Sequence, residues 1–345
     1  MDFKAYEGYL MDAAKEILAA HSPSGYTRAA VEAVRKRAEA CGYGFSMTRR
    51  GCGVVTIPGR NNEEARALLA HVDTLGAMVR SVNEEGQILF TLVGGPVVPS
   101  LDGEYCVIHT RGGREYTGTV LSMSPAAHVF PDAATRPRST DSMYVRVDEP
   151  VKEREDVLAL GIAPGDYIFI DPKTQVTESG YLKSRFIDDK GSAACLLTLM
   201  QMMSDAGAVP ENKTYLIFTV YEEVGSGAAW LPGDITEMLA ADMGCVGLDL
   251  ACTEQQVSIC AKDSGGPYDY EITTRLVELA RKNGIDFAVD IYPFYSSDVT
   301  VAWRSGHDIP AGLIGPGVHA SHGMERTHRD GMMNTVRLLA AYLGL

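Results

Sequence analysis

Two adjacent glutamates, Glu222 and Glu223, directly follow an apolar, β-forming run at residues 215–221. Neighbouring carboxylates repel each other, and such a pair is usually found on a solvated face. Here the preceding run predicts a buried strand, which would deliver both side chains into one cleft. That arrangement suits a site where one carboxylate binds a metal ion while the other moves protons.

Other side chains that can bind metal stand at the carboxyl ends of further predicted strands. They are His71 after the run 68–70, Asp249 after 245–248, and His322 beyond 311–314. In open α/β sheets ligands bind at this edge, because the loops there converge, so these residues are expected to form one site. The pair Asp188 and Asp189 precedes a predicted helix, where a carboxylate can also act as a helix cap.

Two histidines and several carboxylates are the ligands that a two-metal hydrolase requires. Cations about 3.5–4 Å apart need a bridging carboxylate, and Asp188 suits this role. Bound cations lower the pKa of water from about 15.7 to near 7, so a metal-bridging hydroxide would attack the scissile carbonyl. Glu222 is then the candidate general base that relays the proton to the leaving amine.

The composition indicates a folded protein whose partner is not a nucleic acid. The chain has 345 residues, 46% of them hydrophobic, which is enough for one large domain and a smaller one. Its formal net charge is −14, whereas a protein that binds a phosphate backbone presents a basic face.

The cysteines and the first residues predict a cytoplasmic protein. There are seven cysteines, an odd number without a C-x-x-C pair, which is typical of reduced thiols. The first residues carry acidic groups and no long apolar segment, so we expect neither a secretory signal nor a membrane anchor.

The hydrophobic pattern predicts an α/β fold, a mostly parallel sheet flanked by helices, with a β-rich insert. Helices are expected at residues 3–20, 28–40, 193–203, 270–283 and 332–343, and strands at 53–57, 65–70, 216–220, 246–250 and 309–314. Short alternating runs separated by glycine, proline and charged turns fill the stretch between. We therefore expect a catalytic domain of residues 1–74 and 184–345, interrupted by an inserted β-rich domain of residues 75–183.

At its motifs the sequence resembles the dinuclear metallo-aminopeptidases, the family of glutamyl aminopeptidase and the tetrahedral (TET) aminopeptidases, some of which are labelled endoglucanase M. The segments that carry the resemblance are AHVDTLG at 70–76, FIDDKG at 186–191, YEEVG at 221–225, GLDL at 247–250 and HGME at 322–325. The resemblance extends over nearly the whole chain. It implies a zinc-peptidase-like domain with a PDZ-like insert that serves assembly, peptide substrates cleaved at the N-terminus, and a homo-oligomer, often a dodecamer.

The resemblance also implies two divalent cations per subunit that share one carboxylate. The implied ligands are His71, Asp188 and Asp249 for one ion, and Asp188, Glu223 and His322 for the other. Glu222 would be the general base and acid, and Asp73 would orient the imidazole of His71. This set of nitrogen and oxygen donors suits zinc, cobalt and manganese alike.

Some alternatives stay open at this point. A deacylase or carboxypeptidase would use the same metal centre, and a non-catalytic assembly protein could keep the fold, although five buried polar groups would then have no purpose. Only the resemblance selects His322 over His319 and His328. The sequence does not decide whether these two histidines or Asp298 touch the substrate.

Overall fold

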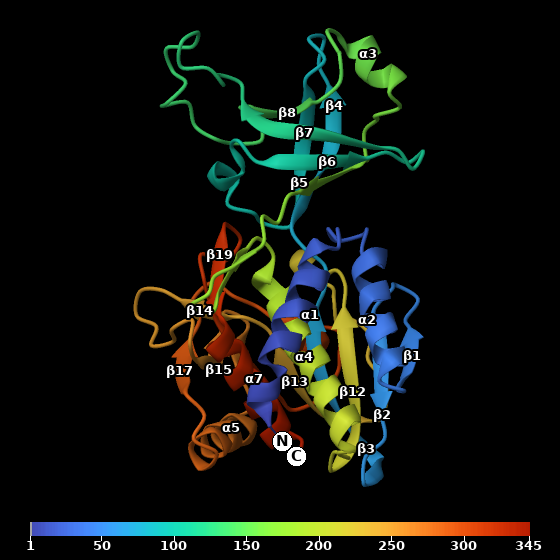
Figure 1. Ribbon diagram of the computed structural model, residues 1–345, viewed down its shortest axis with the longest axis vertical. Coiled ribbons are helices and arrows are strands. Elements are labelled where there is room, and N and C mark those ends of the chain that lie inside the picture. Colours follow the sequence, from blue (N-terminus) through green and yellow to red (C-terminus); the bar gives the residue numbers. More distant parts are fainter. Residues whose placement is uncertain (1) are drawn as a thin grey trace. The chain divides into compact units, whose positions relative to one another are not determined.

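The structure is a computed structural model that describes residues 2–345. The chain forms two compact units: one extends to Asp73 and resumes at Lys173–Leu345, and the other is Thr74–Pro172 (Figure 1). The second unit ends at Pro172 rather than at residue 183. The stretch between contains β10 (Gln175–Val176) and β11 (Tyr181–Ser184), and β11 pairs with a strand of the larger unit. Their alternating pattern predicts strands but does not reveal the partner.

The larger unit is built around a 13-stranded mixed sheet whose centre is parallel. The central strands are, in spatial order, β12 (Asn212–Thr219), β3 (Asn61–His71), β13 (Ile235–Ala241) and β18 (Ala311–His319). Antiparallel strands extend the sheet on either side: β1 (Gly44–Met47) and β2 (Gly53–Ile57) beyond β12, and β19 (Glu325–His328), β11 and β10 beyond β18. A branch from β18 contains β14 (Gly244–Val246), β15 (Val257–Asp263), β16 (Gly266–Pro267) and β17 (Phe287–Ile291). The predicted α/β architecture with a large sheet is confirmed.

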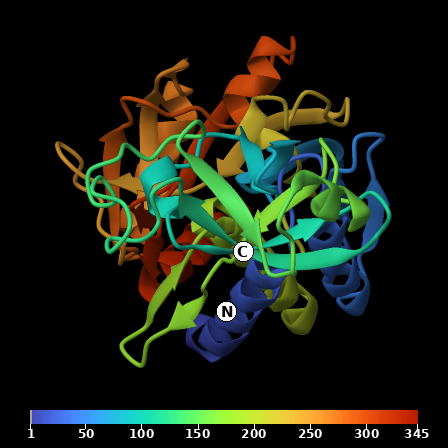
Figure 2. The ribbon, with the colours of Figure 1, turned by 90° about the horizontal axis from the view of Figure 1, so that it is seen from above.

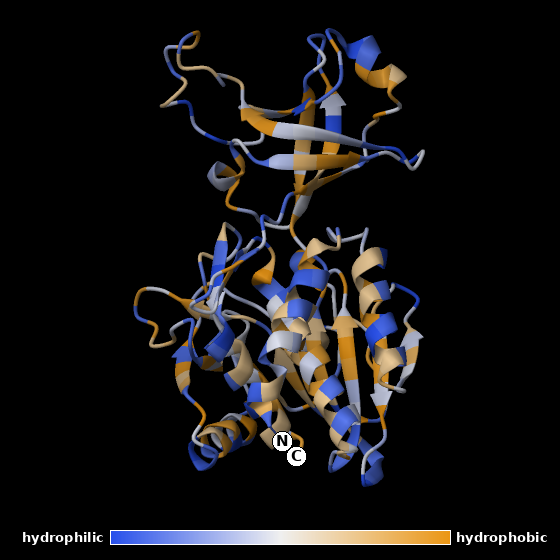
Figure 3. Ribbon diagram, in the orientation of Figure 1, coloured by the Kyte–Doolittle hydropathy of each residue, from blue (hydrophilic) through white to orange (hydrophobic). Residues whose placement is uncertain are grey.

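Helices cover the sheet, whose central strands bury many apolar residues. The colours of Figure 3 mark much of these strands as hydrophobic. The helices are α1 (Glu7–Ala19), α2 (Arg28–Ala40), α4 (Ile187–Ala206), α5 (Tyr270–Lys282), α6 (Asp298–Arg304) and α7 (Arg329–Tyr342). Helix α4 packs against α1, α7 and β3 at once, which explains why its residues are apolar on nearly all sides (Figures 1 and 2). Among the described residues, no helix combines the length and apolar character needed to cross a bilayer.

The smaller unit is a closed six-stranded antiparallel barrel with one short α-helix, α3 (Arg154–Ala159), and one 3-10 helix, η2 (Val98–Leu101). Its strands are, in order around the barrel, β4 (Gly76–Val82), β5 (Ile88–Val93), β8 (Met143–Val147), β7 (Glu115–Ser122), β6 (Tyr105–His109) and β9 (Tyr167–Ile170). Alternate residues of β7, such as Val120 and Ser122, are buried, as expected for a strand with one face toward a barrel interior.

The structure differs from the sequence pattern at the central strand β13. The strand predicted at 246–250 is replaced by the short β14 and an exposed loop, and the strand that enters the sheet lies at 235–241. Its sequence, ITEMLAA, contains Glu, Met, Leu and Ala, which favour helices. Pairing with β3 and β18 overrides this local preference.

Candidate metal centre

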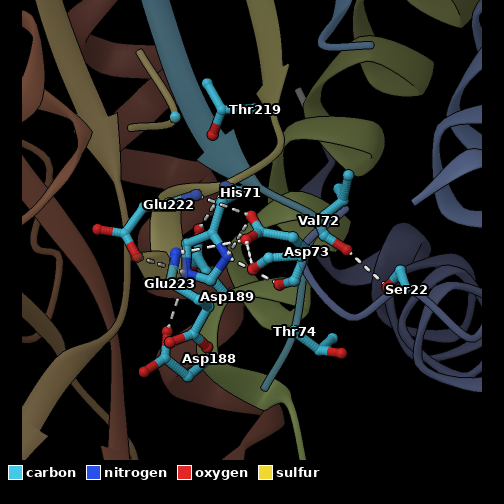
Figure 4. Close-up of polar contacts among 12 residues, drawn as sticks. Ser22, His71, Val72, Asp73, Thr74, Asp188, Asp189, Thr219, Glu222 and Glu223 are labelled. Carbon is cyan, nitrogen blue, oxygen red and sulfur yellow. Dashed lines mark hydrogen bonds and ion pairs between the residues drawn. The ribbon is translucent and has the colours of Figure 1, made fainter. Parts of the chain in front are cut away.

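Five of the predicted site residues lie together near the carboxyl ends of the central strands, and Figure 4 labels four of them, His71, Asp188, Glu222 and Glu223. His71 is the last residue of β3, and Glu222 and Glu223 lie in the 3-10 helix η3 (Glu222–Val224) just after β12. His322 lies in the turn between β18 and β19, and Asp188 lies at the start of α4. Parallel strands end at the same edge of a sheet, which explains the convergence.

Asp188 lies between the two histidines. Its Oδ1 is 3.1 Å from Nε2 of His71, and its Oδ2 is 3.5 Å from Nε2 of His322. The same nitrogen of His322 is 3.5 Å from Oε2 of Glu223. A carboxylate that reaches two histidines with different oxygens has the arrangement that a ligand shared by two cations requires.

The remaining carboxylate of the cluster is Asp242, which corrects the prediction of Asp249. Asp242 directly follows β13 and is buried, and its carboxylate lies with ligand atoms of His71 and Asp189 within 4.8 Å of one another. Asp249 lies in the exposed loop after β14, with a backbone φ of 63°, and within residues 2–345 it belongs to neither group of candidate ligands. The prediction failed because it placed the strand ahead of Asp249 rather than ahead of Asp242. The sequence did contain a signal for Asp242, because this acidic residue directly follows the run 235–241.

Two buried carboxylate oxygens of the cluster indicate that cations fit here. Oδ1 of Asp189 and Oε1 of Glu223 have no hydrogen-bond partner in the part of the chain that the structure describes. Leaving a buried carboxylate oxygen unpaired is unfavourable, and a bound cation removes that cost. A second group of ligand atoms, from His71, Asp188 and Glu223, also lies within 4.8 Å. Imidazole nitrogen and carboxylate oxygen are donors that zinc, cobalt and manganese accept.

Burial sets the protonation of the cluster when no metal is bound. Burial raises the pKa of Glu223 well above its ordinary value, and together with the charge of Asp188 it raises the pKa of Asp242 to about 7. Burial alone would lower the pKa of His71, but the hydrogen bond to Asp188 and the charges of the neighbouring carboxylates together outweigh it, so this pKa is well above its ordinary value. Asp188 is the exception: burial opposes its ionisation, yet hydrogen bonds from His322 and His71 bring its pKa below the ordinary range. The metal-free cluster therefore holds protons that cations must displace.

Glu325 is a site residue to which the sequence analysis assigned no role. Its side chain is 1% exposed and accepts hydrogen bonds of 3.0 Å from the backbone N–H groups of Asp188 and His322. Burial raises its pKa to about 8. Its place in the segment HGME was a signal, but its role also depends on the contact with Asp188, which lies far away in the sequence.

The stability of the metal-free protein should depend on pH through the carboxyl groups of Asp242 and Glu325. The pKa of Asp242 is about 7 in the fold against 3.8 ordinarily, and that of Glu325 is about 8 against 4.5. Because the folded values are raised, the stabilising contribution is complete below pH 4 and is lost as pH rises toward 8. We expect the Tm of chelator-treated protein to fall by roughly several degrees from pH 5 to 8. Thermal unfolding followed by circular dichroism measures this.

The matched control for that experiment is Asp242→Asn, which removes one titrating group. Its Tm should change less with pH than that of the parent, and added zinc or cobalt should stabilise the parent more at pH 8 than at pH 5. A parent whose metal-free Tm rose over this range relative to the variant would contradict the expectation.

Asp73 connects His71 to the loop of the two glutamates. Its backbone carbonyl oxygen lies 3.0 Å from Nδ1 of His71, and its Oδ1 lies 3.6 Å from the same nitrogen. Its carboxylate accepts hydrogen bonds from the backbone N–H of Glu222 at 3.1 Å and of Glu223 at 3.3 Å, and from the Ser24 hydroxyl at 2.5 Å. Asp73 is therefore placed to fix the glutamates as well as the histidine.

Three residues whose role the sequence left open lie in different surroundings. Asp298 is buried at the start of α6, where it accepts hydrogen bonds from the Thr219 hydroxyl and, at 2.8 Å, from the N–H of Ala228. His319 is exposed at the end of β18. His328 caps α7 by accepting a hydrogen bond from the N–H of Asp330, and its Nε2 lies 2.7 Å from a backbone oxygen. Asp298 and His328 thus each contact the backbone of neighbouring residues.

Arg50 contacts both ends of residues 221–226, which we call the glutamate loop. Its guanidinium lies 4.3 Å from the centre of the Tyr221 ring and donates hydrogen bonds to the backbone oxygen and the hydroxyl of Ser226, at 3.2 and 3.1 Å. The loop also closes on itself, because the N–H of Ser226 donates to the carbonyl of Tyr221 at 2.9 Å. Arg50 and Asp73 thus both contact the glutamate loop, Arg50 at its two ends and Asp73 at the two glutamates between them.

Replacing Arg50 by alanine is expected to reduce kcat about tenfold with a smaller change in KM, because the glutamate loop loses its restraint while the cleft stays intact. Arg50→Lys should recover only part of the loss, since an ammonium cannot reproduce the planar fork. Steady-state kinetics on metal-loaded protein measures both. The exposed neighbour Arg49 provides the control variant Arg49→Ala, and equal behaviour of the two alanine variants would contradict the role of Arg50.

Comparison with known proteins identifies the family. Residues 51–338 match the M42 glutamyl aminopeptidase family. The chain belongs to this family. It is 41% identical over 334 residues to the putative aminopeptidase YhfE of Bacillus subtilis, covering 96% of each protein. It is 24% identical to the glutamyl aminopeptidase of Lactococcus lactis over 222 residues, 63% of this chain and 60% of that one.

Solved structures share the fold of this M42 chain. A TET aminopeptidase from a marine sediment Thaumarchaeota archaeon superposes with a TM-score of 0.86 at 18% identity, covering 97% of this chain and 96% of that one. The TET1 peptidase of Pyrococcus horikoshii gives a TM-score of 0.82 at 21% identity, covering 97% and 99%. Membership of the M42 family confirms the prediction of an aminopeptidase, a hydrolase of peptide bonds that depends on metal.

Proposed function

We propose that this aminopeptidase removes N-terminal residues from peptides with two divalent cations, zinc, cobalt or manganese, held by one shared carboxylate. The proposed ligands are His71, Asp188 and Asp242 for one ion, and Asp188, Glu223 and His322 for the other. The observation that carries the proposal is the position of Asp188, whose two oxygens reach both histidines. The unpaired oxygens of Asp189 and Glu223 support the need for positive charge there.

Bound divalent cations would supply Lewis-acid polarisation of the scissile carbonyl and a lowered pKa for the attacking water. Glu222 is the proposed general base and acid. Its Oε2 lies 3.7 Å from Nε2 of His71, it lines the cleft beside Glu223, and burial raises its pKa well above the ordinary value. A carboxyl group with a raised pKa can accept a proton from water and return it to the leaving amine.

Asp73 and Glu325 would hold this machinery in place. Asp73 orients the imidazole of His71 through the backbone carbonyl and fixes the glutamates through two N–H groups. Glu325 fixes the backbone of Asp188 and His322 from behind. Such supporting contacts keep ligands and base in productive positions.

The proposal extends to the oligomeric state of the protein and to its location in the cell. One related TET1 structure is a dodecamer, and the TET1 peptidase of Pyrococcus horikoshii can assemble into a tetrahedron or a large octahedral shell. These assemblies support a homo-oligomer, and a dodecamer in particular, for this chain. We assign the assembly role to the PDZ-like barrel, residues 74–172. All seven cysteines are free, which supports a reducing, cytoplasmic location. Light scattering measures the number of subunits.

The aminopeptidase proposal is tested with aminoacyl p-nitroanilides, with and without N-acetylation, on protein reconstituted with zinc, cobalt or manganese. We expect turnover of the free amines, at least about 100-fold slower turnover of the acetylated compounds, and loss of activity on chelation. The reason is that an aminopeptidase binds its substrate through the free N-terminal amine, which acetylation blocks. Preference for the acetylated compounds would favour a deacylase instead.

A further inference from the structure

Six of the side chains that line the cleft beside the metal centre carry no charge, and we call them the uncharged wall. They come from the loop after β13, from β14, from the loop before α6 and from the turn before His322, and they are Met243, Cys245, Phe294, Tyr295, Ser296 and Ser321. Cys245 and Tyr295 also pack against the buried hydrophobic cluster of the larger unit. The wall is therefore continuous with the core, and it favours apolar groups of a ligand.

The charged groups of the cleft all belong to the proposed catalytic centre. They are Asp188, Glu222, Glu223, Asp242 and His322, and within residues 2–345 no lysine or arginine lines this cleft of about 320 Å³. A glutamate side chain that entered would lose hydration without gaining a dedicated cation. A lysine side chain would meet only carboxylates that the metal centre already requires. Both charges are therefore disfavoured beside the uncharged wall.

Phe294 is the second observation that points to an apolar ligand group. Its side chain lines the cleft, yet it is 97% exposed. The backbone next to it is anchored, because the hydroxyl and N–H of Ser264 donate to the carbonyl of Tyr295 at 2.5 and 3.0 Å. The Tyr295 hydroxyl also donates to the carbonyl of Met243 at 3.1 Å. An anchored loop thus presents an aromatic ring whose apolar surface a bound side chain can cover.

We propose that the cleft selects peptides whose N-terminal side chain is uncharged and apolar, of the size of leucine, methionine or phenylalanine, and that Phe294 determines this specificity. The proposal rests on the aminopeptidase function proposed above and names its substrate class. This specificity differs from the glutamyl specificity that the family's name states. The physical basis is that an apolar side chain gains contact with the wall, whereas a charged one gains no partner.

The test compares kcat/KM of the metal-loaded, full-length enzyme for leucyl, methionyl, phenylalanyl, glutamyl and lysyl p-nitroanilides. We expect the three apolar substrates to exceed the two charged ones by at least about 100-fold. A glutamyl or lysyl substrate that was cleaved as well as the leucyl one would overturn the proposal. Absence of turnover on all five substrates would count against the aminopeptidase function itself. Failure of the specificity proposal is therefore distinguishable from failure of the proposed function.

The role of Phe294 is tested by Phe294→Ala with leucyl and alanyl substrates. We expect kcat/KM for the leucyl substrate to fall about tenfold, mainly through KM, and to change little for the alanyl substrate, whose methyl group makes few contacts. Equal losses on both substrates would overturn the assignment. Leu248, which is 96% exposed and does not line the cleft, provides the control variant Leu248→Ala, expected to behave as the parent.

A gain-of-function variant tests the electrostatic part of the proposal. Ser296 is exposed on the same wall, so Ser296→Arg would supply the missing cation without burying it. We expect the ratio of glutamyl to leucyl kcat/KM to rise about tenfold. An unchanged ratio in a variant with parental metal content would contradict the inference that a missing cation excludes acidic side chains.

Discussion

Replacing Glu222 by glutamine is expected to reduce kcat about 10²–10⁴-fold while both cations stay bound. The reason is that Glu222 belongs to neither group of candidate ligands, although it faces the same cleft. An amide has the size of the carboxylate but cannot take a proton from water. Elemental analysis and steady-state kinetics on an aminoacyl p-nitroanilide measure the two effects on one preparation.

Glu223→Gln is the matched control for this result. It makes the same chemical change one residue away, but on a proposed ligand whose Oε2 lies 3.5 Å from Nε2 of His322. We expect this variant to lose metal as well as activity, since an amide oxygen is a weaker donor than a carboxylate. Parental turnover by Glu222→Gln would exclude Glu222 as the base. Loss of metal from Glu222→Gln would make it a ligand.

Two aspartate variants should distinguish the metal ligand that the structure indicates, Asp242, from the one that the sequence pattern predicted, Asp249. We expect Asp242→Asn to lose at least one metal equivalent and most of the activity, because its carboxylate is buried within reach of His71. Asp249→Asn should retain both metals and parental kinetics, since Asp249 is exposed in a loop. Metal content measured after dialysis, together with kcat, gives a clear result for each variant.

The outcome would be informative in either direction. If Asp249→Asn lost metal and Asp242→Asn did not, the loop after β14 would have to reach the centre in the working enzyme. If both variants kept two equivalents, Asp188, Glu223 and the two histidines would suffice as ligands, and the carboxylate of Asp242 would have another role.

Most of the site was predictable because its residues follow strands with strong apolar patterns. His71 and the glutamates Glu222 and Glu223 come directly after such runs, and strands in the centre of a parallel sheet are buried on both faces. The edge at which they meet follows from the fold class alone. The resemblance then selected His322 among three neighbouring histidines.

The remainder depends on tertiary contacts that local sequence does not encode. Strand β13 is made of helix-favouring residues, so the pattern shifted the strand, and with it the ligand, from Asp242 to Asp249. Glu325 and Arg50 act on residues more than a hundred positions away. The smaller unit ends at Pro172 rather than at the expected residue 183 for the same reason, since β11 is a strand whose partner is known only from the fold.

Because the six strands of the insert close into a barrel, every strand there already has two neighbours. An additional strand from another polypeptide therefore finds no strand with a wholly free edge to join, which disfavours β-augmentation as a way for this unit to bind a partner. We therefore expect any contacts that the insert makes between subunits to use side chains and connecting loops. Substitutions at such surface positions could then dissociate an assembly while leaving each barrel, and each catalytic centre, folded.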